Sequence, residues 1–459
     1  MKKIKVGFLP LYIKLYDDSG ISRKDTQKFY DDVAKILENE GFDVIKTDFC
    51  RVKEEFKLAV ENYEKNNADV ILTLHIAYSP SLESIDALTK TKLPIVVFDS
   101  TEGYSLSKEY SNDPVSNNHG IHGVMDMCNL LKQRGKAYAI ASGHIKNSDV
   151  IKKTCDFIKA SVAAKSLNGS IVGNFGTSFD GMGDFLISKK EAKKVFGIEV
   201  INFTDEQMQL LKNKVSQKEI EEEKLCYINE FNGVEKYPAC DLDNSIRASL
   251  AVRKGVEEYN LSAFSVNFLD VSSNNLGSMP FIECCKAMQR GIGYAGEGDV
   301  LTASFVGALL KGFKDVSFVE IFCPDWKENK LLISHMGEMN YALASQKPDF
   351  SLEDFAFAPI GKVTKGYACF KKGQAVFGNL YKDSDGKYKL LFSQVEMLDD
   401  VSGFDKSIRG WFRPNRPINE FLEKLSEYGA IHHSFLVYDV NIKALEYFGK
   451  LLNLEVNII

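Results

Sequence analysis

The chain has 459 residues, and at roughly 150 residues per domain this length predicts two or three domains. Its 57 lysine and arginine residues and 63 aspartate and glutamate residues give a net charge of −6, which offers no basic surface for nucleic acid. No apolar run approaches the roughly 20 residues of a membrane helix. The nine cysteines include no Cys-x-x-Cys pair, as is usual in a reducing compartment. We therefore expect a globular cytoplasmic protein with no nucleic-acid or membrane partner.

Residues 1–170 alternate between short apolar runs and longer stretches in which apolar residues recur three and four positions apart. This alternation predicts a doubly wound parallel sheet wrapped by helices, and Gly41 provides a left-handed stop after the first long helix. Ligands bind at the carboxyl ends of such strands, so His75, Asp99 and His144 are candidates for a site. The predicted strands cover residues 4–9, 44–47, 70–75, 95–99 and 137–141.

Residues 171–316 continue the alternation in a looser form, which predicts a second α/β domain. The acidic run 221–223 is interpreted as the solvated face of a helix. From residue 317 to 459 the pattern changes to β-type runs, two of which flank Asp385-Gly386, a hairpin signature. We expect a C-terminal antiparallel barrel-like domain. Further strands or helices are predicted at residues 198–203, 248–259, 264–269, 282–290, 301–310, 376–381 and 388–392.

Three glycines, Gly291, Gly293 and Gly296, form a literal G-x-G-x-x-G, which would bind a dinucleotide if it followed a strand in a first βα turn. A helix-like stretch precedes the motif instead, and it lies two-thirds of the way along the chain. We therefore favour a glycine-rich turn before a helix, whose start Glu297 and Asp299 could cap.

Two glutamates lie in otherwise apolar, strand-like surroundings: Glu320 within residues 316–322, and Glu338 just after residues 331–336. Burying an ionised carboxylate without a partner is very costly. One interpretation is a salt bridge from each acid to a nearby lysine or arginine. The other is that both acids and a histidine bind a divalent metal, for which manganese, magnesium, cobalt or iron fits better than a thiolate-type zinc site. The spacing alone favours neither interpretation.

Short motifs occur in order along nearly the whole chain. The C-terminal half contains GIGYAGEGDVLTASFVGALL (291–310), SFVEIF (317–322), ISHMGE (333–338) and GAIHHSFLVYDVNIKALEYFGKLLNLEV (429–456). The N-terminal half contains KLYDD (14–18), LHIAYSP (74–80), HGIHGVMD (119–126) and SGHI (142–145). Because an unrelated protein would seldom reproduce this ordered series, the chain resembles the L-fucose and L-arabinose isomerase family of sugar isomerases.

The resemblance implies a metal-dependent aldose–ketose isomerase that acts on a pentose or (deoxy)hexose through an enediol intermediate. It implies that Glu320 and Glu338 bind the metal and move the proton as base and acid, and that His433 is the third ligand. Mn²⁺ is the expected ion, with Mg²⁺, Co²⁺ and Fe²⁺ as alternatives.

The resemblance also implies residues that hold the sugar and a likeness in assembly. By position, His75 and His122 are expected to bind sugar hydroxyls from the N-terminal domain, together with Tyr16 and, near the metal, His432. The family's members are oligomers, which implies a homo-oligomer here, a trimer or hexamer, in which a neighbouring subunit could supply the N-terminal residues.

One stretch departs from the family pattern. Arabinose isomerases carry a further metal-binding histidine about one strand after the second acid, whereas this sequence has Ala358 and Pro359 in the corresponding residues 355–362. An L-arabinose substrate is therefore not implied. Two alternatives stay open: an isomerase of a modified hexose such as a sulfonated sugar, and a non-catalytic sugar-binding protein that keeps the isomerase fold.

Overall fold

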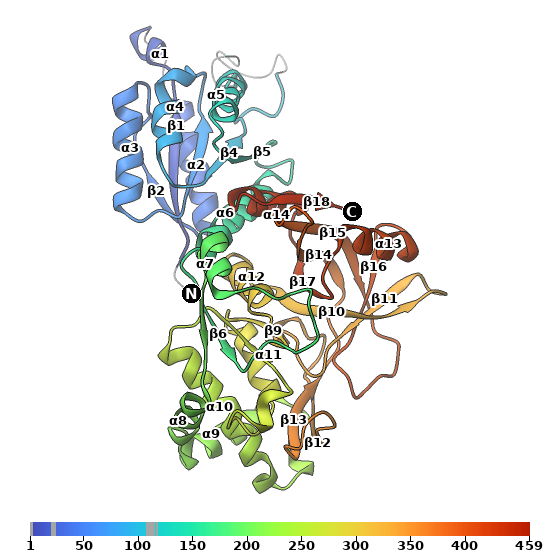
Figure 1. Cartoon of the computed structure of the whole chain (residues 1–459). Coiled ribbons are helices and arrows are strands. Elements are labelled where there is room, and N and C mark those ends of the chain that lie inside the picture. The colour runs from blue at the N-terminus through green and yellow to red at the C-terminus, as the bar shows by residue number, and fades with distance from the viewer. Residues whose placement is uncertain (1–2, 20–23, 107–114, 116–117) are drawn as a thin grey trace. The chain divides into compact units, whose positions relative to one another are not determined.

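The computed structural model describes residues 3–19, 24–106, 115 and 118–459, and the chain divides into two compact units (Figure 1). The first unit comprises residues 1–165 and 443–451, and the second comprises residues 166–442 and 452–459. The second unit holds a parallel sheet and a barrel, and the domain boundary expected near residue 316 stays a prediction. Across the described ranges, no helix combines the length and apolar character needed to cross a membrane.

The first unit is a doubly wound α/β fold, as predicted. Its elements are β1 (Lys5–Leu11), α1 (Lys14–Asp18), α2 (Lys24–Asn39), β2 (Asp43–Lys46), α3 (Lys53–Lys65), β3 (Val70–His75), α4 (Ser81–Lys90), β4 (Ile95–Asp99), α5 (Ile121–Gln133), β5 (Tyr138–Ser142), α6 (Val150–Leu167) and α14 (Ile442–Leu451). The parallel strands have the order β2-β1-β3-β4-β5. Alternate side chains of β1 point to opposite faces: Leu9 packs with α3, α4 and α5, whereas Phe8 stacks on Tyr30 of α2. Gly41, with φ of +94°, follows α2 as predicted.

A four-stranded parallel sheet forms the first part of the second unit, in the order β7-β6-β8-β9. Its elements are β6 (Ile171–Phe175), α7 (Lys189–Phe196), β7 (Glu199–Asn202), α8 (Asp205–Asn213), α9 (Gln217–Glu230), α10 (Asp243–Glu258), β8 (Ala263–Val266), α11 (Phe281–Gln289), β9 (Gly293–Gly296) and α12 (Val300–Gly312). The expectation of a wholly solvated acidic run is wrong for Glu223. Its side chain is buried and pairs with Arg253 at 2.8 Å and Lys286 at 2.9 Å, whereas Glu222 is exposed.

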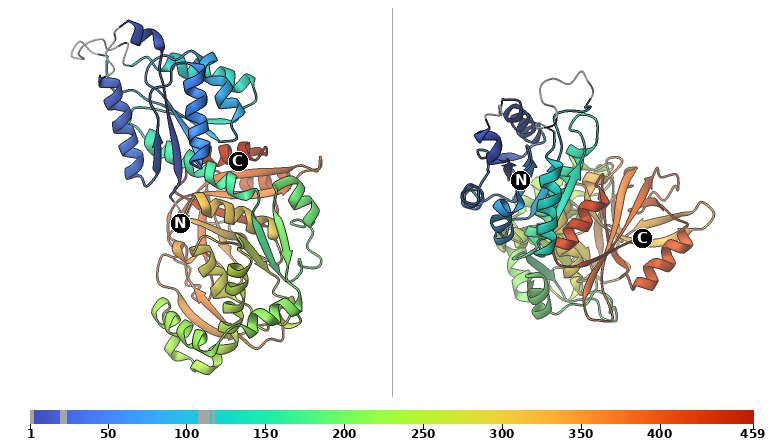
Figure 2. Two further views of the ribbon diagram at one scale, coloured as in Figure 1. Left: turned by 90° about the vertical axis from the view of Figure 1, so that its left-hand side faces the viewer. Right: turned by 90° about the horizontal axis from the view of Figure 1, so that it is seen from above.

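A closed antiparallel barrel forms the rest of this unit and confirms the predicted β-rich C-terminal architecture (Figure 2). Its strands are β10 (Val316–Asp325), β11 (Lys330–Ser334), β14 (Gly373–Lys382), β15 (Tyr388–Leu398), β16 (Gly410–Pro414) and β17 (His433–Tyr438). The order is β14-β17-β10-β11-β16-β15, and β14–β15, the predicted hairpin, closes the ring. Outside the ring lie β12 (Asp349–Asp354), β13 (Lys362–Tyr367), α13 (Ile418–Tyr428) and β18 (Glu455–Ile458). Short 3-10 helices cover Val234–Lys236, Ala239–Leu242, Asp270–Ser272 and Tyr341–Leu343.

Helix α12 joins the parallel sheet to the barrel, because it contacts β8 and β9 as well as β10 and β17. Apart from Lys311, all of its residues are buried, as expected for a helix that is apolar on every side. A Cβ on Gly293 would lie 2.2 Å from the Ala303 carbonyl oxygen, so strand and helix touch through their backbones. Asp299 caps the helix by accepting hydrogen bonds from the N–H groups of Leu301 and Thr302. The predicted turn before a helix covers only residues 297–299, because Gly293 and Gly296 begin and end strand β9.

Candidate metal centre

Strand register brings Glu320 next to two histidines. Glu320 of β10 lies directly opposite His433 of β17 on one side and Ser334 of β11 on the other. Because side chains alternate along a strand, Val319 packs in the barrel core and Glu320 points to the outer face. His335 follows Ser334, and its Nε2 lies 3.7 Å from Oε2 of Glu320. Three potential ligands thus come from adjacent positions on the outer surface of the barrel.

Glu297 joins this cluster from the turn between β9 and α12. Its Oε2 lies 3.3 Å from Nε2 of His433 and 3.4 Å from Nε2 of His432. Its backbone has φ of +64°, a left-handed conformation that costs a residue other than glycine about 1–3 kcal/mol. Hydrogen bonds from its N–H to Val266 and from the N–H of Phe179 to its carbonyl hold it there. Two overlapping groups have ligand atoms within 4.8 Å of one another: Glu297, His432 and His433, and Glu320, His335 and His433.

Each histidine of the cluster has a carboxylate on its other ring nitrogen. Such a partner fixes the tautomer and the orientation of the ring, and leaves Nε2 directed into the cluster. The three Nδ1-to-oxygen distances are 2.7 Å for His335 and Glu338, 3.0 Å for His433 and Asp299, and 2.7 Å for His432 and Asp184.

Glu338 lies behind His335 and outside the two groups of possible ligands, and its expected role as a metal ligand stays a prediction. Its carboxylate is buried behind His335, where Oε2 also accepts a hydrogen bond from the N–H of Gly337 at 2.8 Å. Its Oε1 accepts a hydrogen bond from the Tyr294 hydroxyl at 2.8 Å. Burial alone would raise the pKa of Glu338, but the charge of His335 and the hydrogen bonds with His335 and Tyr294 together lower it. Both oxygens of Glu338 thus have hydrogen-bond partners within the protein.

The buried acids and imidazoles of the cluster shift one another's pKa values. Burial raises the pKa of Glu320, which the nearby histidines only partly offset. Glu297 shows the opposite balance: despite burial, its hydrogen bond with His432 and its closeness to His433 and His335 hold its pKa well below the usual range. Burial would lower the pKa of both His335 and His432, but their carboxylate partners raise it to about 9 and about 10. A cation bound here would compete with imidazole protons, so its affinity would depend on pH.

Two family models match most of the second unit. Residues 187–312 match the L-arabinose isomerase central domain, and residues 315–455 match the L-arabinose isomerase C-terminal domain. The chain belongs to the L-fucose and L-arabinose isomerase family.

Full-length relatives place the chain as a distant family member. It is 23% identical to the L-arabinose isomerase of Shouchella clausii over 423 residues, which cover 88% of this chain and 84% of that one. L-arabinose isomerase 1 of Clostridium acetobutylicum is 22% identical over 480 residues, covering 100% of this chain and 96% of the relative. The L-arabinose isomerase of Escherichia coli O7:K1 is 22% identical, covering 87% and 82%.

In this family member, sequence reasoning misses two members of the cluster, His335 and Glu297. It takes Glu338 as the functional residue of ISHMGE and looks for a further histidine near Ala358. Ala358 instead lies, partly exposed, in the loop between β12 and β13. His335, three residues before Glu338, supplies the second central imidazole. The signals that could have found them are a histidine directly after an apolar strand and the acid of GEGD at the end of another.

Gly296 provides the space that the His335 imidazole occupies. A Cβ on this residue would lie 2.8 Å from Cε1 and 3.1 Å from Nε2 of His335. Two of the three glycines in the G-x-G-x-x-G pattern are therefore explained by close approach, Gly293 to α12 and Gly296 to the metal centre.

Other predicted site residues lie in the first unit. Tyr16 Oη is 2.7 Å from Nε2 of His119, and the His119 ring centroid is 5.8 Å from that of the exposed His122. His75 ends β3 and is buried against Gly123, and neither ring nitrogen has a hydrogen-bond partner among the described residues. Burial lowers the pKa of His75 to about 3. His432, by contrast, belongs to the metal cluster of the second unit.

Proposed function

We propose that this chain is a metal-dependent aldose–ketose isomerase acting on a pentose or (deoxy)hexose. The relatives named L-arabinose isomerase support sugar isomerisation. The observation that carries the metal site is the convergence of two carboxylates and two imidazoles, each imidazole held from behind by an acid. The proposed ligands are Glu297, Glu320, His335 and His433. Oxygen and imidazole donors suit Mn²⁺, the proposed ion, and also Mg²⁺, Co²⁺ or Fe²⁺.

His433 fits a metal ligand especially well. Its imidazole is completely buried, and Nδ1 is occupied by Asp299. Nε2 has no hydrogen-bond partner among the described residues, although Oε2 of Glu297 lies 3.3 Å away. An unsatisfied buried polar atom costs about 1–3 kcal/mol, and a cation bound between imidazole and carboxylate would recover that cost.

Isomerisation moves a proton between C2 and C1 of the sugar, and neither carbon releases it unaided. A divalent ion supplies polarisation of the carbonyl and stabilises negative charge on the sugar oxygens. Glu320 is suited to accept and return the proton, because burial raises its pKa while its side chain stays 20% exposed. Glu297 is proposed for the opposite side of the exchange. Glu338 keeps a role in activity through His335 and not by contact with the sugar.

His432, Tyr16 and His122 are proposed to bind sugar oxygens. His432 is 32% exposed and is oriented by Asp184, so it can donate a hydrogen bond beside the metal ligands. Tyr16 and His122 lie near the carboxyl ends of β1 and β3, where doubly wound sheets bind ligands. His75 is buried, and we propose that it supports the start of α5 and does not contact the sugar. We further propose a homo-oligomer, in which first-unit residues serve a neighbouring subunit.

The non-catalytic alternative rested on the absence of a histidine near Ala358. His335 fills the place of a second central imidazole, so this motivating observation no longer holds.

Proton exchange in deuterated water tests the proposal. Metal-stripped protein is incubated with a panel of aldopentoses, deoxyhexoses and aldohexoses, Mn²⁺ is added, and NMR detects deuterium at C2 of the aldose or C1 of the ketose. We expect metal-dependent incorporation with at least one sugar. Glu320→Gln should abolish incorporation and weaken Mn²⁺ binding, whereas Glu328→Gln, at an exposed position after β10, should do neither. Incorporation that persists without metal, or in the Glu320→Gln variant, would contradict the proposal.

A further inference from the structure

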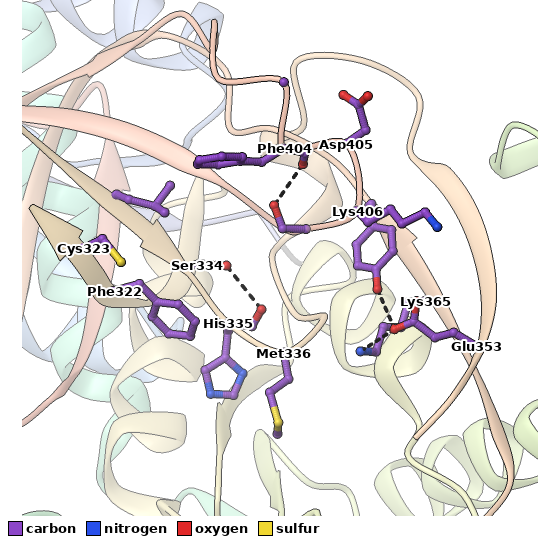
Figure 3. A pocket seen from close by; sticks show the side chains of 14 residues that line it. Phe322, Cys323, Ser334, His335, Met336, Glu353, Lys365, Phe404, Asp405 and Lys406 are labelled. Carbon is purple, nitrogen blue, oxygen red and sulfur yellow. Dashed lines mark hydrogen bonds and ion pairs between the residues drawn. The ribbon is translucent and has the colours of Figure 1, made fainter. Parts of the chain in front are cut away.

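A cavity of about 920 Å³ opens next to the metal centre, with His335 in its wall. Its volume is within the range of about 300–1,000 Å³ typical of ligand pockets. One side is the outer face of β10 and β11, and the other is the hairpin β12–β13 with residues 403–407. In Figure 3, His335 and Phe322 lie at one side of the pocket, and Lys365 and Glu353 lie together at the other. Of the four proposed ligands, His335 lines this cavity and so connects its second wall to the cluster.

The second wall carries a polar group built from the hairpin β12–β13. Lys365 Nζ lies 2.9 Å from Oε1 of Glu353, and the Tyr367 hydroxyl donates to the same oxygen at 2.6 Å. Oε2 of Glu353 accepts a hydrogen bond from the Ser351 hydroxyl at 3.2 Å. The Lys365 ammonium also lies 4.8 Å from the centre of the Phe281 ring. The group is thus fixed in place from several directions.

The burial of this ion pair calls for an explanation beyond stability. The Lys365 side chain is 11% exposed and that of Glu353 is 33% exposed. Desolvating a buried pair can cost as much as its attraction returns, and solvent screens the more exposed Glu353, so the pair adds little to stability. The pair nevertheless retains binding capacity: an ammonium has three N–H donors and a carboxylate about four acceptor positions, more than the contacts above use. Donors and acceptors side by side on a cavity wall match a sugar hydroxyl, which needs both.

The charges that line the cavity favour a neutral ligand. Two lysines, Lys365 and Lys406, are matched by two acids, Glu353 and Asp405. The remaining wall is largely apolar and includes the rings of Phe322 and Phe404, which can pack against the C–H groups of a sugar. The two carboxylates would repel a phosphate or sulfonate that the lysines attract.

We propose that Lys365, Glu353 and Tyr367 form a second subsite that binds the hydroxyl groups of a neutral sugar at the end remote from its carbonyl. The inference rests on the proposed isomerase function, because that function places the carbonyl end at the metal ligands. The subsite makes the chain selective for aldoses long enough to reach it.

Binding of linear alditols tests this subsite separately from turnover, because alditols have no carbonyl and cannot be isomerised. Calorimetry compares a tetritol with a hexitol in the Mn²⁺-loaded wild type and in Lys365→Met and Glu353→Gln. We expect each substitution to weaken hexitol binding about tenfold, with tetritol and Mn²⁺ affinities unchanged. Lys362→Met, at an exposed lysine of the same strand, is the matched control and should bind both alditols as the wild type does.

Unchanged thermal unfolding confirms that each variant is folded, and Lys365→Arg keeps the charge if Lys365→Met does not fold. Equal weakening of tetritol and hexitol would overturn the subsite, as would hexitol binding that no substitution at these positions alters. Tighter binding of a hexose 6-phosphate or a 6-sulfonated hexose than of the hexitol would overturn the neutral class. Hexitol binding lost in Lys365→Met, together with a failure of proton exchange, would support the subsite and count against the isomerase proposal alone.

Discussion

Histidines beside the ends of β-strands in the two units of this molecule have opposite electrostatics. In the second unit, His335 and His432 have carboxylates on Nδ1, and their pKa values are raised to about 9 and about 10. In the first unit, His75 is buried with no hydrogen bond to either ring nitrogen among the described residues, and its pKa is lowered to about 3. Burial disfavours the imidazolium in both groups. The acid behind the ring therefore decides the charge.

The presence or absence of a carboxylate on Nδ1 distinguishes histidines that could bind a cation from a histidine that stays neutral. A carboxylate on Nδ1 orients the ring and increases the basicity of Nε2, as metal-binding histidines require. A buried imidazole without such a partner stays neutral and serves packing, as His75 does against Gly123. The presence of histidines at strand ends thus says little until the groups behind them are known.

Removing the acid behind His335 should have the largest effect on this contrast. Glu338→Gln keeps the size of the side chain and removes its charge, so Nδ1 of His335 faces a neutral amide in place of a carboxylate. We expect Mn²⁺ affinity, measured by calorimetry, to fall about 10- to 100-fold, with kcat/KM falling alongside it. Glu328→Gln is the exposed control. Complete loss of Mn²⁺ binding would instead support the ligand role that the sequence implies for Glu338, and unchanged affinity would contradict both roles.

The elements of the fold that the sequence predicts well depend on residues that are neighbours in the sequence. The strands of the first unit match their apolar runs to within one or two residues, because such runs depend on neighbours in sequence. The Asp385-Gly386 hairpin and the Asp299 cap are equally local signals. The burial of Glu223 is not a local signal. Its partner Arg253 lies on another helix, so the apolar periodicity within α9 does not predict the ion pair.

The metal centre is predicted only in part for the same reason. Glu320 and His433 meet because β10 pairs with β17 in one particular register, and a shift of one residue would separate them. The side chain that points toward the cluster could be that of Glu338 or that of His335, because the path of the loop decides this. The motif ISHMGE alone does not show which of the two it is. Only the contact between His335 and Glu338 shows that one stands behind the other.

Crowding His335 should have the next largest effect. In Gly296→Ala, the new methyl group would lie 2.8 Å from Cε1 of His335, so the ring or the turn must move. We expect Mn²⁺ affinity to fall about tenfold and the free energy of unfolding to fall by about 1–3 kcal/mol. Gly183→Ala is the matched control, because nothing lies within 4 Å of the position of its Cβ. Equal results for the two variants would show that His335 does not depend on this space.

The buried, neutral imidazole of His75 predicts that the free energy of unfolding depends on pH. The folded-state pKa of His75 is about 3 and the unfolded value is about 6.5, so between them only the unfolded chain binds the proton. Stability from this group is therefore complete above about pH 6.5 and lost as pH falls, by about 1.4 kcal/mol per pH unit for one proton. His75→Gln should reduce the slope of unfolding free energy against pH in urea titrations. Above about pH 7, where His75 is neutral in both the folded and the unfolded chain, the two proteins should have the same slope. Identical slopes for wild type and His75→Gln at lower pH would mean that His75 is not held neutral.

Substitution of Asp184 should have the smallest effect on activity, and it tests whether His432 binds the sugar or the metal. Its Oδ2 accepts hydrogen bonds from the backbone N–H of His432 at 2.9 Å and from Nδ1 at 2.7 Å, so Asp184→Asn would weaken the hold on that ring. If His432 binds a sugar oxygen, KM should rise about threefold while kcat and Mn²⁺ affinity change little. Asp180→Asn, an exposed substitution in the same loop, provides the baseline. A loss of Mn²⁺ affinity as large as that in Glu338→Gln would show that His432 binds the metal and not the sugar. Removing the acid behind a histidine lowers metal affinity only if that histidine is a ligand.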